Sequence, residues 1–109
     1  MNIYKLEKEL ARAKKNLIKE ALDSCTAIVE DTFVGGDTNG LKADFPEEVT
    51  YNDINIAFQA LKLNIEHISL KTPSIEVVIM MEAYQSELGY YLIMYDDELN
   101  RIDEYFVIE

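Results

Sequence analysis

The chain has 109 residues, 49% of them hydrophobic, and its 21 acidic and 10 basic side chains give a formal net charge of -11. This length suits one hydrophobic core, and the apolar fraction excludes a disordered acidic chain, so we expect a single domain over residues 1–109. The charge disfavours direct binding to nucleic acid or to an anionic membrane, because both of those surfaces are negative as well.

The N-terminal segment has the pattern of a long amphipathic helix. Apolar residues recur every three or four positions from Ile3 to Ile28, and lysines and glutamates fall between them. Asn2 is a suitable N-cap. The β-branched stretch over residues 26–34 also suits an extended segment, but we favour a helix that ends near Glu30.

A second helix is predicted after an irregular connection. Residues 35–40, GGDTNG, favour turns, and Thr50 stands three residues before Asp53 in an imperfect capping box. An apolar stripe then follows with the helical spacing 4, 3, 4, 3; its members are Ile54, Phe58, Leu61, Ile65 and Ile68. A second apolar stripe lies beside it, so the helix is apolar on two sides and is expected to be central; the members of the second stripe are Ile56, Ala60, Leu63 and Leu70. Pro73 ends this region.

The C-terminal third alternates with a period of two and predicts three strands, over residues 75–84, 90–96 and 101–108. Turns are expected at Leu88-Gly89 and over residues 97–100. The predicted fold is therefore α+β, a two-layer sandwich in which the long N-terminal helix and the central second helix pack on one face of a three-stranded antiparallel meander. Both alternating sets contain large apolar residues, and we place one set on the other, outward face: Val78, Met80, Tyr84, Tyr91, Ile93 and Tyr95.

Catalytic chemistry has little support in the sequence. Cys25 and His67 are the only residues of their types, and each falls on an apolar helical stripe, where a packed thiol and a core imidazole are the commoner interpretations. A serine nucleophile, Ser24 or Ser69, could be combined with His67 on paper, but no G-x-S-x-G elbow supports it. We do not expect an enzyme.

Cofactor and metal motifs are also missing. The glycine-rich loop lacks the Gly-Lys-Ser/Thr ending of a phosphate-binding loop, and an EF-hand counted from Asp37 puts Lys42 where glycine is required. One histidine and one cysteine do not suffice for a structural zinc site within one chain. Paired carboxylates for glycoside chemistry stay open among 21 acids. We expect neither a cofactor nor a metal.

The combination of tyrosines and acids in the C-terminal third is the strongest candidate for a binding surface. Tyrosine is enriched at interfaces, and carboxylates around it can pair with a partner's Lys or Arg. The competing interpretation is that these tyrosines are half buried in the sheet as ordinary β formers. The predicted partner-binding residues are Glu82, Tyr84, Tyr91, Tyr95, Asp96, Asp97, Glu98, Asp103, Glu104 and Tyr105.

The charge is unevenly distributed, which favours a basic protein as partner. Residues 1–20 hold six of the ten basic side chains, whereas residues 21–109 hold eighteen acidic against four basic ones. We interpret the chain as a protein that binds and neutralises or regulates a basic protein, as an immunity protein or antitoxin does when it blocks a bacterial nuclease toxin. A cytoplasmic location is expected, because the chain has a single cysteine and the segment MNIYKLEKEL lacks the apolar core of a signal peptide.

Two other classes stay open. The first is a homo-oligomeric structural or adaptor module, such as a homodimer, that associates through the second sheet face. The other is a small-ligand-binding domain or enzyme, for which the discriminating observation would be His67 facing an open cavity.

Overall fold

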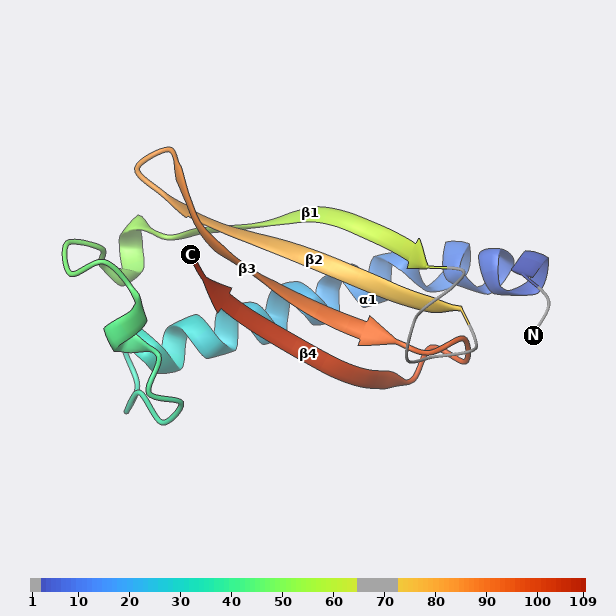
Figure 1. The fold of residues 1–109 in the computed structure, drawn as a ribbon, viewed down its shortest axis with the longest axis horizontal. Coiled ribbons are helices and arrows are strands. Elements are labelled where there is room, and N and C mark those ends of the chain that lie inside the picture. Colours follow the sequence, from blue (N-terminus) through green and yellow to red (C-terminus); the bar gives the residue numbers. More distant parts are fainter. Residues whose placement is uncertain (1–2, 65–72) are drawn as a thin grey trace.

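The computed structural model describes residues 3–64 and 73–109. One long helix is followed by two 3-10 turns and four strands (Figure 1). Their bounds are α1, Ile3–Phe33; η1, Lys42–Asp44; η2, Tyr51–Asp53; β1, Asn55–Asn64; β2, Ser74–Ala83; β3, Ser86–Tyr95; and β4, Arg101–Ile108.

The strands form one antiparallel sheet in the order β1-β2-β3-β4. Helix α1 runs across one face of this sheet (Figure 1) and packs mainly against β1, β2 and β3. The predicted apolar stripe of α1 is its buried face, and Cys25 lies on it with no exposed surface. The core between the two layers consists chiefly of Leu6, Leu17, Ala21, Cys25 and Val29 from the helix and Ile75, Val77, Ile79, Met81, Tyr91, Ile93 and Tyr95 from the sheet.

The α+β class and the long N-terminal helix are thus confirmed. The helix continues to Phe33, one turn beyond the expected end near Glu30. Thr32 lies within this last turn, and its hydroxyl donates a 2.8 Å hydrogen bond to the carbonyl of Ile28. The backbone N–H groups of Val34 and Gly35 then both bond to the carbonyl of Glu30, and this closes the last turn.

The predicted second helix is wrong: within the described residues its sequence forms β1, so the sheet has four strands instead of three. The pairing of β1 with β2 shifts between Phe58 and Ala60, where Gln59 is an extra, bulged residue. Without the bulge, the next side chain after Phe58 to face α1 would be two residues on. With the bulge it is Leu61, three residues on, so the apolar spacing resembles that of a helix. The later members of the stripe, Ile65 and Ile68, lie outside the described residues, as do His67 and Ser69.

The predicted capping box does form, but it caps only the short turn η2. The carboxylate of Asp53 accepts hydrogen bonds from the backbone N–H and the hydroxyl of Thr50, both at 2.8 Å. Because Ile54 is already extended, the chain turns directly into β1 instead of starting a helix.

The predicted turn at Leu88-Gly89 is also wrong. Tyr84 and Gln85, with φ of 54° and 63°, make the turn between β2 and β3, and Leu88 is the bulged residue of a strand that begins at Ser86. Gly89 lets β3 and β4 approach each other closely, because a Cβ at this position would lie 1.9 Å from the carbonyl oxygen of Val107 in β4.

The outward face of the sheet differs from the expected one. In the β2–β3 register, Ile79 pairs with Tyr91, Val77 with Ile93 and Ile75 with Tyr95. Paired residues share a face, so Tyr91, Ile93 and Tyr95 point toward α1 and belong to the core. The predicted outward placement of these three residues is therefore wrong, and their neighbours Tyr90, Leu92 and Met94 face away from the helix.

Candidate partner-binding surface

The sheet face opposite α1 is covered by no described element, and we call it the open sheet face (Figure 1). The strand registers arrange its side chains in cross-strand rows. Two central rows are apolar or aromatic, and a row with acidic residues lies beyond each of them. The central rows are Ala57, Met80, Tyr90, Val107 and Ala60, Val78, Leu92, Tyr105; the outer rows are Asn55, Glu82, Glu87 and Lys62, Glu76, Met94, Asp103, with Glu109 following β4 beside Glu87.

This arrangement gives an apolar band between acidic margins. Val78 and Met94 are only 8% and 7% exposed although no described element lies above them, because their cross-strand neighbours cover them. Tyr105 is 45% exposed at the β4 side of the band. Among the described residues, the charged side chains of the face are five acids and one lysine, Lys62, so the band is surrounded by net negative charge.

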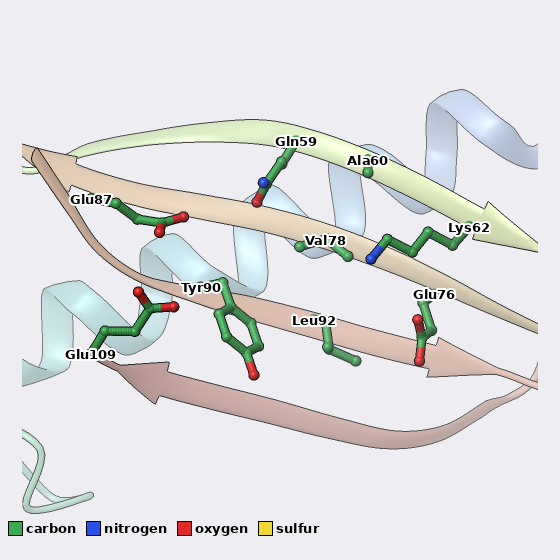
Figure 2. A pocket seen from close by; sticks show the side chains of 9 residues that line it. All are labelled: Gln59, Ala60, Lys62, Glu76, Val78, Glu87, Tyr90, Leu92 and Glu109. Carbon is green, nitrogen blue, oxygen red and sulfur yellow. The ribbon is translucent and has the colours of Figure 1, made fainter.

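A groove of about 320 Å³ lies within this face. Figure 2 shows its lining in front of the strands, with α1 behind them. The groove exists because β1 contributes Ala60 where β3 contributes the larger Tyr90 and Leu92, so the floor over Val78 is lower than its surroundings.

Both edges of the sheet carry features that disfavour pairing with another strand. Strand β1 has the bulge at Gln59 and the exposed Lys62, both of which disfavour edge pairing. On β4, the N–H of Glu109 bonds to the carbonyl of Leu88 in β3. Backbone N–H groups along β4 point alternately toward β3 and away from it, so the N–H of Glu104 points toward the open edge. That N–H already donates to the carboxylate of Asp103 at 2.8 Å. These features favour the open sheet face over the β1 and β4 edges as the surface that binds a partner.

Three of the predicted partner residues lie on the open sheet face: Glu82, Asp103 and Tyr105. Asp103 also accepts a 2.8 Å hydrogen bond from the hydroxyl of Tyr105, which raises the pKa of this tyrosine and fixes its ring over the sheet. Their positions agree with a surface role, and the binding itself stays a prediction.

The predicted acidic group Asp96, Asp97 and Glu98 lies in the turn between β3 and β4. Asp96 is a structural residue there, because one of its carboxylate oxygens accepts hydrogen bonds from the backbone N–H groups of Glu98 and Asn100, each at 2.9 Å. Asp97 and Glu98 carry the charge that this turn presents at the end of the sheet.

Three other predicted residues lie on the helix side of the sheet. Tyr91 and Tyr95 are 0% and 1% exposed, so their rings offer no contact area to a partner. The hydroxyl of Tyr91 donates to Glu104 at 2.6 Å, and Arg101 donates to both Tyr91 and Glu104, at 2.8 and 2.7 Å. Burial, assisted by the hydrogen bond to Glu104, raises the pKa of Tyr91. Burial and the nearby charge of Glu20 raise the pKa of Tyr95 to about 12.

The remaining predicted residue, Tyr84, lies at the opposite end of the sheet in the β2–β3 turn. It is 63% exposed, and its hydroxyl donates to Asp53 at 2.7 Å. This bond lowers the pKa of Asp53, with smaller contributions from Thr50. Tyr84 therefore holds the β2–β3 turn to η2 and leaves only the outer part of its ring for contact.

Sequence reasoning missed several residues that line the groove, among them Glu76, Glu87, Tyr90, Leu92 and Glu109. The signal was present as the second set of the period-two pattern in β2 and β3. It could not be assigned to a face, because the bulge at Leu88 and the position of the β2–β3 turn fix which set faces the helix.

The other candidate sites gain no support from the described residues. Burial raises the pKa of the Cys25 thiol to about 12, so its reactive thiolate is suppressed. His67, Ser69 and any pair they form lie outside the described residues. Among residues 3–64 and 73–109, no three acidic, histidine or cysteine side chains gather closely enough to hold a metal ion. In the same part of the chain, no helix has the length and apolar character needed to cross a membrane.

No protein family model, curated protein or solved structure matches this chain. Conclusions on function therefore rest on the geometry of the open sheet face.

Proposed function

We propose that this protein is a binding protein that captures a basic protein on its open sheet face and neutralises or regulates it. The observation that carries this proposal is the apolar band with acidic margins, because aromatic and aliphatic side chains supply buried area and the surrounding carboxylates select a cationic surface. The net charge of -11 adds long-range attraction that accelerates encounter with such a partner.

Self-association through the same face is disfavoured by charge. Among the described residues, five acids against Lys62 leave a net charge of -4 on the face, so two copies placed face to face would bring like charges together while covering the apolar band. A basic partner would instead bring opposite charges together, because its cations would pair with the carboxylates of the face. The homo-oligomeric alternative is thus less favourable, and we expect the isolated protein to be a monomer in light scattering.

The partner class that we favour is a nuclease-type toxin of bacterial origin, with this protein as its cytoplasmic immunity protein or antitoxin. A nuclease attracts phosphates with a cationic cleft, and a small acidic domain with an aromatic and aliphatic surface can occupy that cleft by steering followed by burial. The same surface requires no catalytic group, in keeping with a protein that acts by blocking another.

Charge reversal on the open sheet face tests this proposal. The immobilised protein is exposed to a native lysate at low salt, and bound proteins are eluted by a salt gradient and identified. We compare the wild type with Glu82→Lys/Glu87→Lys and with the control Glu47→Lys/Glu48→Lys, which changes the net charge equally in the exposed loop before η2. The expected result is a basic protein that is lost from the face variant and kept by the control. Equal retention by all three proteins, or a partner that is not basic, would refute the proposal.

A further inference from the structure

The groove on the open sheet face has a polarity along its length. Glu87 and Glu109 lie at one end, and Lys62 and Glu76 lie at the other (Figure 2). The floor between them consists of Val78 and Leu92, with the ring of Tyr90 beside the Glu87–Glu109 end. A ligand with a cationic head and an apolar stem matches this sequence of surfaces.

The carboxylates of Glu87 and Glu109 are available for a ligand. Within the part of the chain that the structure describes, neither carboxylate takes part in an ion pair or a side-chain hydrogen bond. Both side chains extend from the end of the sheet toward the groove in Figure 2. Glu109 is positioned by its backbone N–H, which bonds to the carbonyl of Leu88 at 2.8 Å.

We propose that the groove binds an arginine side chain of the basic partner, with its guanidinium between Glu87 and Glu109 against the ring of Tyr90, an inference that rests on the proposed function. The aliphatic stem of arginine would lie over Val78 and Leu92, and the opposite end, where Lys62 is the cross-strand neighbour of Glu76, offers the head no net negative charge. The groove thereby sets the direction in which the side chain enters.

Arginine suits this site better than lysine for two physical reasons. Its guanidinium is planar and weakly hydrated, so it stacks on an aromatic ring such as that of Tyr90 more favourably than an ammonium group. Its N–H donors also lie in one fixed plane, so it can donate hydrogen bonds to two separate carboxylates, Glu87 and Glu109, at once. An apolar side chain alone would leave both carboxylates without a partner.

Two peptide probes test the inference without knowledge of the natural partner. Fluorescein-labelled deca-arginine and deca-lysine are titrated with the protein at low salt, and binding is followed by anisotropy. The wild type is compared with Tyr90→Leu, with Glu87→Gln/Glu109→Gln and with the control Glu47→Gln/Glu48→Gln, which removes two charges elsewhere; circular dichroism verifies that each variant is folded. Amide chemical shifts in the wild type locate the bound peptide.

We expect deca-arginine to bind about 2- to 5-fold more tightly than deca-lysine, and its shifts to concentrate on β3 from Glu87 to Leu92. Tyr90→Leu should abolish this preference and leave deca-lysine binding nearly unchanged, whereas Glu87→Gln/Glu109→Gln should weaken both peptides more than the control does. Equal affinities for the two peptides in the wild type, or a preference that survives Tyr90→Leu, would overturn the inference.

The outcome is separable from that of the proposed function. If the lysate partner depends on Glu82 and Glu87 but the wild type does not prefer arginine, the groove inference fails while capture of a basic protein stands. If arginine is preferred through Tyr90 but no basic protein is retained by the open sheet face, the groove binds its probe and the proposed function fails.

Discussion

The hydroxyl of Tyr91 in β3 lies 2.6 Å from a carboxylate oxygen of Glu104 in β4, and Arg101 donates to both groups. This contact joins the end strand of the sheet to the core, because Tyr91 is fully buried while Glu104 is exposed. Arg101 extends the connection to α1 through Glu20, at 3.4 Å. Tyr91 and Glu104 were both predicted from the sequence to bind a partner, but in the structure they bond to each other.

Replacement of Tyr91 by phenylalanine tests this role. Tyr91→Phe removes the donor to Glu104 and the acceptor of Arg101, and a hydrogen bond to a charged group contributes about 1.5–3 kcal/mol. We expect the free energy of unfolding in urea to fall by about that amount. Tyr84→Phe is the matched control, since its hydroxyl also bonds to a carboxylate, Asp53, but lies at an exposed position. Equal losses for the two variants would show that the Tyr91 contact has no special weight.

Burial raises the pKa of several groups, among them Tyr91, Cys25 and Tyr95, and this makes the stability of the protein depend on pH in the alkaline range. Burial raises the pKa of Cys25 to about 12 from its usual 9.0 and, with Glu20, the pKa of Tyr95 to about 12 from its usual 10.0. Both groups are neutral when protonated, so the unfolded state loses these protons at lower pH than the folded state does. Their contribution is therefore fully present below about pH 9 and is lost as pH rises toward 12.

Urea unfolding between pH 8 and 11.5 measures this effect. We expect the free energy of unfolding to fall over the upper part of this range, and Tyr95→Phe to fall less steeply above pH 10 than the wild type. The hydroxyl of Tyr95 has no hydrogen-bond partner among the described residues, so its removal should not destabilise the protein near pH 8. Stability that is constant to pH 11.5, or identical slopes for the two proteins, would contradict this account.

The sequence predicted those elements whose apolar period is undisturbed. Helix α1 keeps a regular stripe from Leu6 to Val29, and β2 alternates without interruption, so both were located correctly. Strand β1 was not, because the bulge at Gln59 turns an alternation of two into the spacing of a helix. A single extra residue therefore changed the predicted type of a whole element.

The candidate surface was predictable in composition but not in detail. The excess of acids and tyrosines in the C-terminal third pointed to the sheet, and Glu82, Asp103 and Tyr105 do lie on its open face. Which tyrosines are buried depends on strand register, which turn geometry decides and a pattern of period two does not. Tyr90 and Tyr91 are neighbours in sequence and lie on opposite faces because side chains alternate along a strand, and the register decides that Tyr91 is the buried one.

Gly89 should be indispensable for the connection between the two C-terminal strands. A Cβ at this position would lie 1.9 Å from the carbonyl oxygen of Val107 and 2.9 Å from Cα of Ile108, and both contacts are with backbone that cannot move aside without opening the β3–β4 pair. We expect Gly89→Ala to lower the free energy of unfolding by about 3–5 kcal/mol, in the range of the most damaging substitutions.

Gly36→Ala is the control, because its Cβ would meet only a methyl group of Thr38, at 3.8 Å, and it should leave stability nearly unchanged. Strand separation at Gly89 would also displace Glu109, which is held by the carbonyl of Leu88. Under conditions where Gly89→Ala is still folded, its preference for deca-arginine should therefore be smaller than that of the wild type. Wild-type stability in Gly89→Ala would mean that β4 can shift freely, and then the position of Glu109 at the groove would not be fixed by the sheet.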